Sequence, residues 1–123
     1  MHPLYRSIVG VLIMALMLAS CAHRPERYYF GSYSEGERLY SKGDYKKAIA
    51  HYQAYINENP DGNLAVISHY YMGKSYLALG QPEEAKKIFE RILEKYPDAV
   101  WANFAQNQLK ELELHSQNKP SSV

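Results

Sequence analysis

An internal repeat with a constant shift of 37 residues constrains the fold of this chain more than any other feature. Glycine, alanine and proline recur at matching places in two consecutive segments: Gly36 with Gly73, Gly43 with Gly80, Ala48 with Ala85, and Pro60 with Pro97. Large side chains keep their size, as in Tyr52 with Phe89. A period of 20 to 50 residues is typical of stacked supersecondary units. The sequence therefore predicts a stacked array, with a third and incomplete unit after the second.

Each unit is predicted to form two helices, because apolar residues recur every three or four positions between breaks. The expected helices cover residues 35–42, 45–56 and 64–79, followed by one that starts at Pro82 and one that starts at Asp98. Gly43 and Gly80 are expected to stop the first helix of each unit in a left-handed conformation. Asp44 is expected to cap the next helix, and Pro82 suits a first helical turn. These features indicate an all-α fold.

The spacing Gly-x6-Gly-x-Tyr-x2-Ala-x3-Tyr-x2-Tyr-x4-Pro, from Gly36 to Pro60, resembles the tetratricopeptide repeat (TPR). The segment from Gly73 to Pro97 fits nearly as well, with Pro82 in place of the usual aromatic residue. The resemblance implies a helix-turn-helix TPR-like solenoid of about two repeats plus a C-terminal capping helix. Because such arrays usually need about three repeats, we expect the domain to form a homodimer or to be completed by a partner.

The first twenty residues are arranged like a secretory signal. A basic start with Arg6 precedes an uncharged run from Ile8 to Leu18, and small residues precede Cys21. This run is shorter than the ~20 residues of a membrane-spanning helix. Leu-Ala-Ser-Cys, ending at Cys21, resembles the lipobox of bacterial lipoproteins, which implies a lipid on that thiol and cleavage before it. An uncleaved anchor and an ordinary buried thiol remain the alternatives.

The chain is accordingly expected to divide into four parts. These are a lipoprotein signal peptide (1–20), a lipidated tether (21–30), a TPR-like domain (31–115) and a disordered tail (116–123). The residue after the cysteine is Ala22 rather than Asp, and the sorting rule of enterobacterial lipoproteins then implies the outer membrane, with the domain facing the periplasm. The tether spans at most about 30 Å, which keeps the domain near its membrane.

A binding surface follows from the same resemblance, because the first helix of each pair lines the concave side in this family. The positions carried over are Tyr33, Glu37, Tyr40, Tyr70, Lys74, Leu77, Asn107 and Glu111. Tyrosine suits such a groove, since its ring gives rigid apolar contact and its hydroxyl can still bond to a peptide. Alternatively, some of these side chains pack against one another or against residues 28–30. The basic clamp of chaperone-binding members is absent, since its positions hold Tyr33, Glu37 and Tyr71.

Composition and spacing give no support to an enzyme or a cofactor site. The formal net charge of +1 offers no electrostatic reason to bind nucleic acid. The single cysteine excludes an internal disulfide and a cysteine-rich zinc site, and the five histidines show no metal-ligand spacing. Gly73-Lys74-Ser75 lacks the upstream glycine of a phosphate loop. We therefore expect no metal, no cofactor and no catalysis.

The sequence favours an outer-membrane lipoprotein that acts as a TPR protein-protein interaction adaptor in an envelope assembly complex. Its plan is similar to the repeat proteins of the β-barrel assembly machine and the Tol-Pal system, and to pilotin lipoproteins of type IV pili. The expected partners are an envelope protein or peptide segment and, through lipid on Cys21, the membrane. The alternative is a structural accessory subunit of a secretion, pilus or lipoprotein complex, without a peptide-binding groove.

Overall fold

The computed structural model describes residues 8–11, 13–14 and 30–119. Residues 30–119 form helices joined by short turns, and no strand occurs within the described ranges. The helices are α2 (Ser32–Ser41), α3 (Tyr45–Glu58), α4 (Asn63–Ala78), α5 (Pro82–Lys95) and α6 (Val100–Gln117). The predicted all-α fold is confirmed. The expected signal cleavage site, Cys21 and nearly all of the tether lie outside the described residues.

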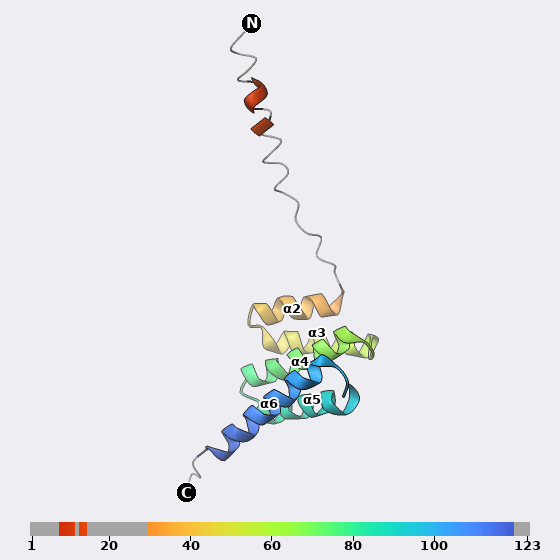
Figure 1. The fold of residues 1–123 in the computed structure, drawn as a ribbon, viewed down its shortest axis with the longest axis vertical. Helices are drawn as coiled ribbons and strands as arrows, with labels where there is room; N and C mark the ends of the chain where they lie inside the picture. The colour runs from red at the N-terminus through yellow and green to blue at the C-terminus, as the bar shows by residue number, and fades with distance from the viewer. Residues whose placement is uncertain (1–7, 12, 15–29, 120–123) are drawn as a thin grey trace.

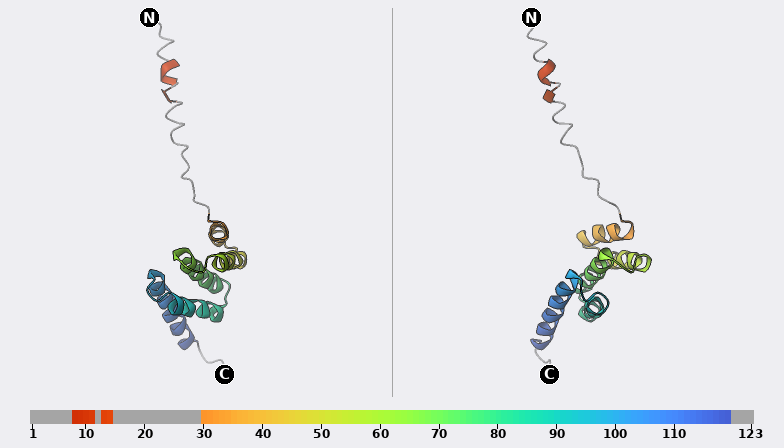
Figure 2. Two further views of the ribbon diagram at one scale, coloured as in Figure 1. Left: turned by 90° about the vertical axis from the view of Figure 1, so that its right-hand side faces the viewer. Right: turned by 45° about the vertical axis from the view of Figure 1, so that its right-hand side comes forward.

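The helices pack in the order in which they follow one another along the chain (Figure 1). Each contacts the next, and in addition α2 contacts α4 and α4 contacts α6. Two further views show the same progression from α2 to α6 (Figure 2). This is the arrangement of stacked helical hairpins, in which each unit buries its apolar side only against its neighbours.

Two apolar clusters form the core, one for each repeat. The first surrounds Tyr52 between α2, α3 and α4, and the second surrounds Phe89 between α4, α5 and α6. Both rings are 0% exposed. Tyr76 packs against both clusters, so the two repeats share one continuous interior.

Glycine is needed where the two helices of a hairpin touch. A Cβ atom on Gly36 would lie 2.8 Å from the Tyr52 ring, and one on Gly73 would lie 2.6 Å from the Phe89 ring. Such distances are too short for a carbon contact, so the large residue of the second helix requires a glycine on the first. In both units the glycine of the first helix is therefore in direct contact with the large aromatic residue of the second.

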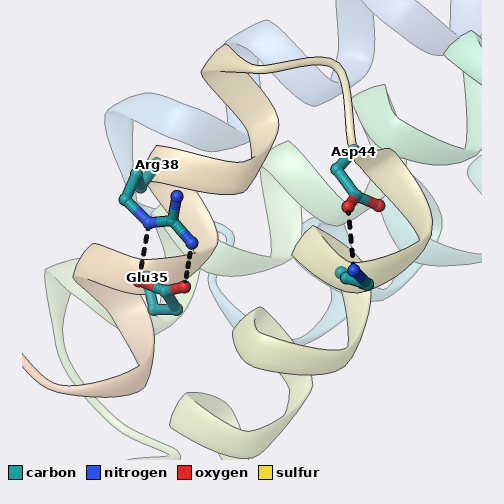
Figure 3. Close-up of polar contacts among 4 residues, drawn as sticks. Glu35, Arg38 and Asp44 are labelled. Carbon is teal, nitrogen blue, oxygen red and sulfur yellow. Dashed lines mark hydrogen bonds and ion pairs between the residues drawn. The ribbon is translucent and has the colours of Figure 1, made fainter.

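The predicted glycine stops of the helices are confirmed, but the predicted capping hydrogen bond of Asp44 is absent. Gly43 and Gly80 have φ values of 78° and 71°, which is the left-handed region, and Pro82 is the first residue of α5. Asp44 does precede α3, yet its side chain makes no capping hydrogen bond. Its Oδ2 atom lies 3.4 Å from Lys47 Nζ instead, in an ion pair one turn into the helix (Figure 3).

The last helix differs from its expected bounds at both ends. It begins at Val100 rather than Asp98, because residues after α5 form a turn in which Ala99 N–H donates to the Tyr96 carbonyl at 3.1 Å. It continues to Gln117, two residues beyond the expected end of the domain. The first residues of the expected tail are thus helical, and residues 120–123 lie outside the described chain.

The linker between the repeats is held against the end of α5. Lys95 Nζ donates to the Pro60 carbonyl at 3.2 Å, and Tyr96 Oη donates to the same oxygen at 2.7 Å. Gly62, at the end of this linker, has a φ of 106°. The residues that lengthen the repeat beyond the family's usual 34 therefore form an ordered connection.

Candidate functional site

The predicted binding residues all lie on α2, α4 and α6, the first helices of the three units. Because α4 contacts both α2 and α6, these helices form one row. This row brings together side chains that are about thirty residues apart in the sequence, such as Tyr40 with Tyr71 and Tyr70 with Trp101.

Five aromatic rings form a continuous network across this row. The ring centroids of Tyr40 and Tyr71 are 5.0 Å apart, which joins α2 to α4, and those of Tyr70 and Trp101 are 5.0 Å apart, which joins α4 to α6. Tyr70 also contacts Tyr71 at 5.6 Å, and Trp101 contacts Phe104 at 5.3 Å. These separations are typical of favourable aromatic pairs. We call these five residues the aromatic face.

The aromatic face is reachable from solvent while its rings hold one another in place. Phe104 is 45% exposed, and the other four side chains are half-buried. Burial raises the pKa of the Tyr40 and Tyr70 hydroxyls, so both stay neutral. Large, rigid and partly exposed aromatic residues of this kind dominate binding at protein interfaces.

Tyr40 and Tyr70 were expected from the sequence, whereas Tyr71, Trp101 and Phe104 were not identified as binding residues. The repeat aligns Trp101 with Leu64 and Phe104 with Ile67, which made both look like packing positions. The sequence did contain one sign of a different role for these two residues. At both positions the last unit has a larger aromatic residue where the second unit has an aliphatic one.

Tyr33 takes a different position from the other expected groove residues. Its side chain is 6% exposed and packs against the rings of Tyr52 and Tyr55, at centroid distances of 6.2 and 5.6 Å. Its hydroxyl donates to Glu37 Oε1 at 2.8 Å, and burial raises its pKa well above the usual value. Tyr33 therefore orients Glu37 and offers little surface of its own.

One charged residue stands at the same repeat position of each first helix: Glu37, Lys74 and Glu111. Lys74 Nζ donates to Gln108 Oε1 at 3.3 Å, and Gln108 Nε2 donates to Glu111 Oε2 at 3.5 Å. Burial is the main cause that raises the pKa of Tyr70, and the negative charge of Glu111 adds to it.

The two remaining predicted residues contribute less to this surface. Leu77 is half-buried and packs on the second apolar cluster, while Asn107 is exposed on α6. The structure thus gathers Tyr40, Tyr70 and the charged positions around one face, and it places Tyr33 and Leu77 mainly in the packing.

No cluster of metal-binding side chains appears among residues 8–11, 13–14 and 30–119. They contain no group of three or more His, Cys, Asp or Glu side chains that could hold a metal ion. A cavity of about 300 Å³ lies away from the aromatic face, between the start of α5 and the end of α6. Its lining includes Pro82, Leu112 and His115, and none of the predicted groove residues.

Comparison with known proteins identifies the repeat. A family model described as tetratricopeptide repeat matches residues 39–111, more than half of the chain. The chain belongs to the tetratricopeptide repeat family. All five residues of the aromatic face lie inside the matched range.

The chain is also similar to part of a much longer plant protein. The chain is 34% identical over 82 residues to a protein named Protein CTR9 homolog from Arabidopsis thaliana. The alignment covers 66% of this chain and 7% of that protein, so the chain corresponds to a small part of it.

Membership in this family indicates the general kind of function. TPR domains bind protein partners and are typically scaffolds without catalytic activity. No helix within the described ranges is both long enough and apolar enough to cross a bilayer. The TPR domain is therefore a protein-protein interaction module, and its first helices carry the aromatic side chains suited to that task.

Proposed function

We propose that the chain is a lipid-anchored adaptor at the periplasmic face of a bacterial outer membrane, where its TPR domain binds another envelope protein. The observation that carries this proposal is the sequence Leu-Ala-Ser-Cys, which ends at Cys21 behind an uncharged apolar run and stands just before a TPR domain. The proposal needs no cofactor and no metal.

Lipid on Cys21 would account for both attachment and location. Burial of acyl chains contributes about 0.8 kcal/mol per methylene group, so two or three chains hold a protein on a membrane durably. Ala22 after the cysteine favours the outer membrane. The short connection from Cys21 to α2 would keep the domain within about 30 Å of the bilayer, which favours a partner located at the same membrane.

The aromatic face is the proposed contact with that partner. Its rings span three helices, and their mutual contacts mean that little side-chain freedom is lost when a partner covers them. A second copy of the chain is a further proposed partner, because an array of two repeats is short for this family. Light scattering of the full chain in detergent tests this point, and a stable monomer would contradict it.

The anchor is tested by labelling cells with an alkyne analogue of palmitate. The wild-type chain should be labelled, Cys21→Ser should not, and Ala22→Ser serves as the matched control that keeps its label. In an enterobacterial host, Ala22→Asp should keep the label but move the protein from the outer to the inner membrane fraction. Equal labelling of wild type and Cys21→Ser would refute the anchor.

The adaptor role is tested by mild crosslinking and affinity purification of the full chain from envelopes. Tyr40→Ala combined with Tyr70→Ala should lose the captured partners, while Leu114→Ala, at a residue that is 59% exposed on the last turns of α6, should keep them. Circular dichroism checks that both variants remain helical. Unchanged capture by the folded double variant would favour the structural accessory subunit instead.

A further inference from the structure

Two carboxylates stand on the outer helices of the row, Glu37 on α2 and Glu111 on α6. Glu37 lies three residues before Tyr40 on α2, and Glu111 lies seven residues after Phe104 on α6, so each shares a helix face with a ring of the network. Both side chains are exposed, and neither forms an ion pair within residues 30–119. Each outer helix of the row therefore presents an uncompensated negative charge.

The helix between these two, α4, has a lysine at the same repeat position. Lys74 of α4 is half-buried, and its amino group is hydrogen-bonded to Gln108. Across the row from α2 to α6, the charges therefore alternate as negative, positive, negative. A complementary partner has a basic residue near each edge and none in the middle, because a central base would face Lys74.

The tyrosine hydroxyls on this face are free to bind main chain. Tyr40, Tyr70 and Tyr71 make no hydrogen bond through their hydroxyls in the part of the chain that the structure describes. A helical partner uses its own carbonyl groups internally, whereas a polyproline II segment has none of its backbone bonded and leaves every carbonyl open. The rings supply flat apolar surface, on which proline side chains pack well.

The width of the row sets the spacing of the two basic residues. Neighbouring packed helices lie about 8 to 10 Å apart, so α2 and α6 are separated by roughly 16 to 20 Å across α4. A polyproline II segment rises about 3.1 Å per residue and covers this span in about five or six residues.

From these features we propose that the aromatic face binds an extended, proline-containing segment of the partner, with basic residues about five or six positions apart that pair with Glu37 and Glu111. The inference rests on the proposed adaptor function and names the chemistry of its partner. The prolines lie over Tyr70, Trp101 and their neighbours, and the tyrosine hydroxyls donate to the carbonyl groups of the segment.

Trp101 makes the test direct, since it is the only tryptophan of the chain and belongs to the aromatic face. The probe is a blocked seven-residue peptide that alternates proline and valine between two terminal arginines. It is titrated into the full chain in detergent while Trp101 emission is recorded. We expect a saturable change in emission, and an affinity that falls at least threefold between 50 and 500 mM NaCl, because exposed charge pairs are screened.

Two further peptides decide between partner classes. The same peptide with glutamate at both ends should bind at least tenfold more weakly. An alanine- and leucine-rich peptide that forms a helix and carries the same two arginines should also bind at least tenfold more weakly. Equal or tighter binding of either peptide would overturn the proposal, and tighter binding of the helical one would identify the partner as a helix.

Matched variants test the two carboxylates. Glu37→Gln with Glu111→Gln should weaken arginine-peptide binding about fivefold to tenfold and remove its salt dependence; the amide still accepts the bond from Tyr33. Glu58→Gln with Glu94→Gln, at exposed positions on the second helices, should change binding less than twofold. Equal effects of the two pairs would contradict the assignment.

The capture experiment separates this inference from the proposed function. If no peptide changes Trp101 emission while envelope partners are still lost with Tyr40→Ala and Tyr70→Ala, the adaptor stands and the proline-containing segment is wrong. If capture is also unaffected by that variant, both proposals fail together.

Discussion

The two complete repeats differ from the third unit at the position where the first helix of a hairpin touches the second. Gly36 and Gly73 each lie against an aromatic ring of the next helix, at distances that admit no Cβ atom. The equivalent position in α6 is Lys110, which is exposed. A helix could not seat an aromatic ring against this side chain as α3 and α5 do against the glycines. The third unit therefore lacks the glycine that admits a ring in the other two, and α6 has a solvent-exposed lysine at that position.

The same comparison explains why α6 carries the most exposed part of the aromatic face. Leu64 and Ile67 at the start of α4 are half-buried against the first cluster. The corresponding residues of α6 are Trp101 and Phe104, and Val100 beside them is 70% exposed. The last helix, α6, thus has a polar residue at the position where α2 and α4 contact the second helix of their hairpins. It has aromatic residues on the side that continues the row formed by α2 and α4.

The largest expected effect on stability comes from removing the Phe89 ring, which packs against Gly73. Phe89→Ala empties a site that is 0% exposed in the second cluster, and we expect a loss of about 3–5 kcal/mol in the free energy of unfolding. Urea denaturation followed by circular dichroism measures it. Phe104→Ala, at a ring that is 45% exposed, is the control and should cost far less. Equal losses would contradict the assigned core.

The second prediction concerns a residue that sets the second repeat apart. His69 is 3% exposed with no partner for Nδ1, while the aligned positions hold Ser32 and the exposed Gln106. Burial, with added repulsion from Arg91 and Lys95, lowers the pKa of His69 to about 4. Between pH 6.5 and 4 the imidazole of His69 therefore stays neutral in the folded state, whereas in the unfolded state it is protonated below its ordinary pKa of about 6.5.

Stability from His69 is therefore complete above pH 6.5 and declines as the pH falls toward 4, by about 2–3 kcal/mol. Since other groups also titrate in acid, the measurement is the slope of unfolding free energy against pH between 7 and 4, from urea titrations. His69→Leu should flatten this slope, and the exposed control His115→Gln should not. An unchanged slope in His69→Leu would show that the buried imidazole has no such role.

The third prediction tests the glycine contact itself. Gly73→Ala gains helix propensity of about 1 kcal/mol but forces a Cβ atom against Phe89, which costs about 1–3 kcal/mol, so the net effect should be destabilising. With Phe89→Ala also present, the same change should become neutral or stabilising. A double-mutant cycle by urea denaturation measures this coupling, and additive effects would disprove the contact.

The smallest effect is expected at the aligned position of the third unit. Lys110 is exposed, so Lys110→Ala should leave stability nearly unchanged, and Lys110→Gly should cost only about 0.5–1 kcal/mol through helix propensity. Thermal unfolding of both variants measures it. A larger loss for Lys110→Ala would mean that α6 packs there against something, such as a second copy of the chain.

Much of the fold could be predicted because its determinants are local. Gly43 and Gly80 adopt the left-handed conformation that only glycine reaches readily, and Pro82 suits a first turn, so the helix boundaries follow from single residues. The predictions that were wrong concern residues whose role depends on contacts with other residues. Asp44 pairs with Lys47 rather than capping α3, and a turn after α5 delays the start of α6 to Val100.

The candidate site was predictable in part for the same reason. Alignment of the repeats identified the three helices of the row and two rings of the aromatic face, Tyr40 and Tyr70. The alignment alone does not tell whether a side chain is buried by its neighbours. Tyr33 and Tyr70 are aligned in the repeat, yet one is 6% exposed in the core and the other joins the aromatic face. The difference arises from the neighbours that each helix meets.

The sequence by itself determined the repeat, the helical hairpins and the residue pairs that let them close, because glycine, proline and apolar spacing act through the chain's own geometry. Only the tertiary structure decided which aromatic side chains form a shared surface and which carboxylates flank it. Tyr40 meets Tyr71, and Tyr70 meets Trp101, only when α2, α4 and α6 stand side by side. Burial and charge environment depend on that packing, which no single repeat contains.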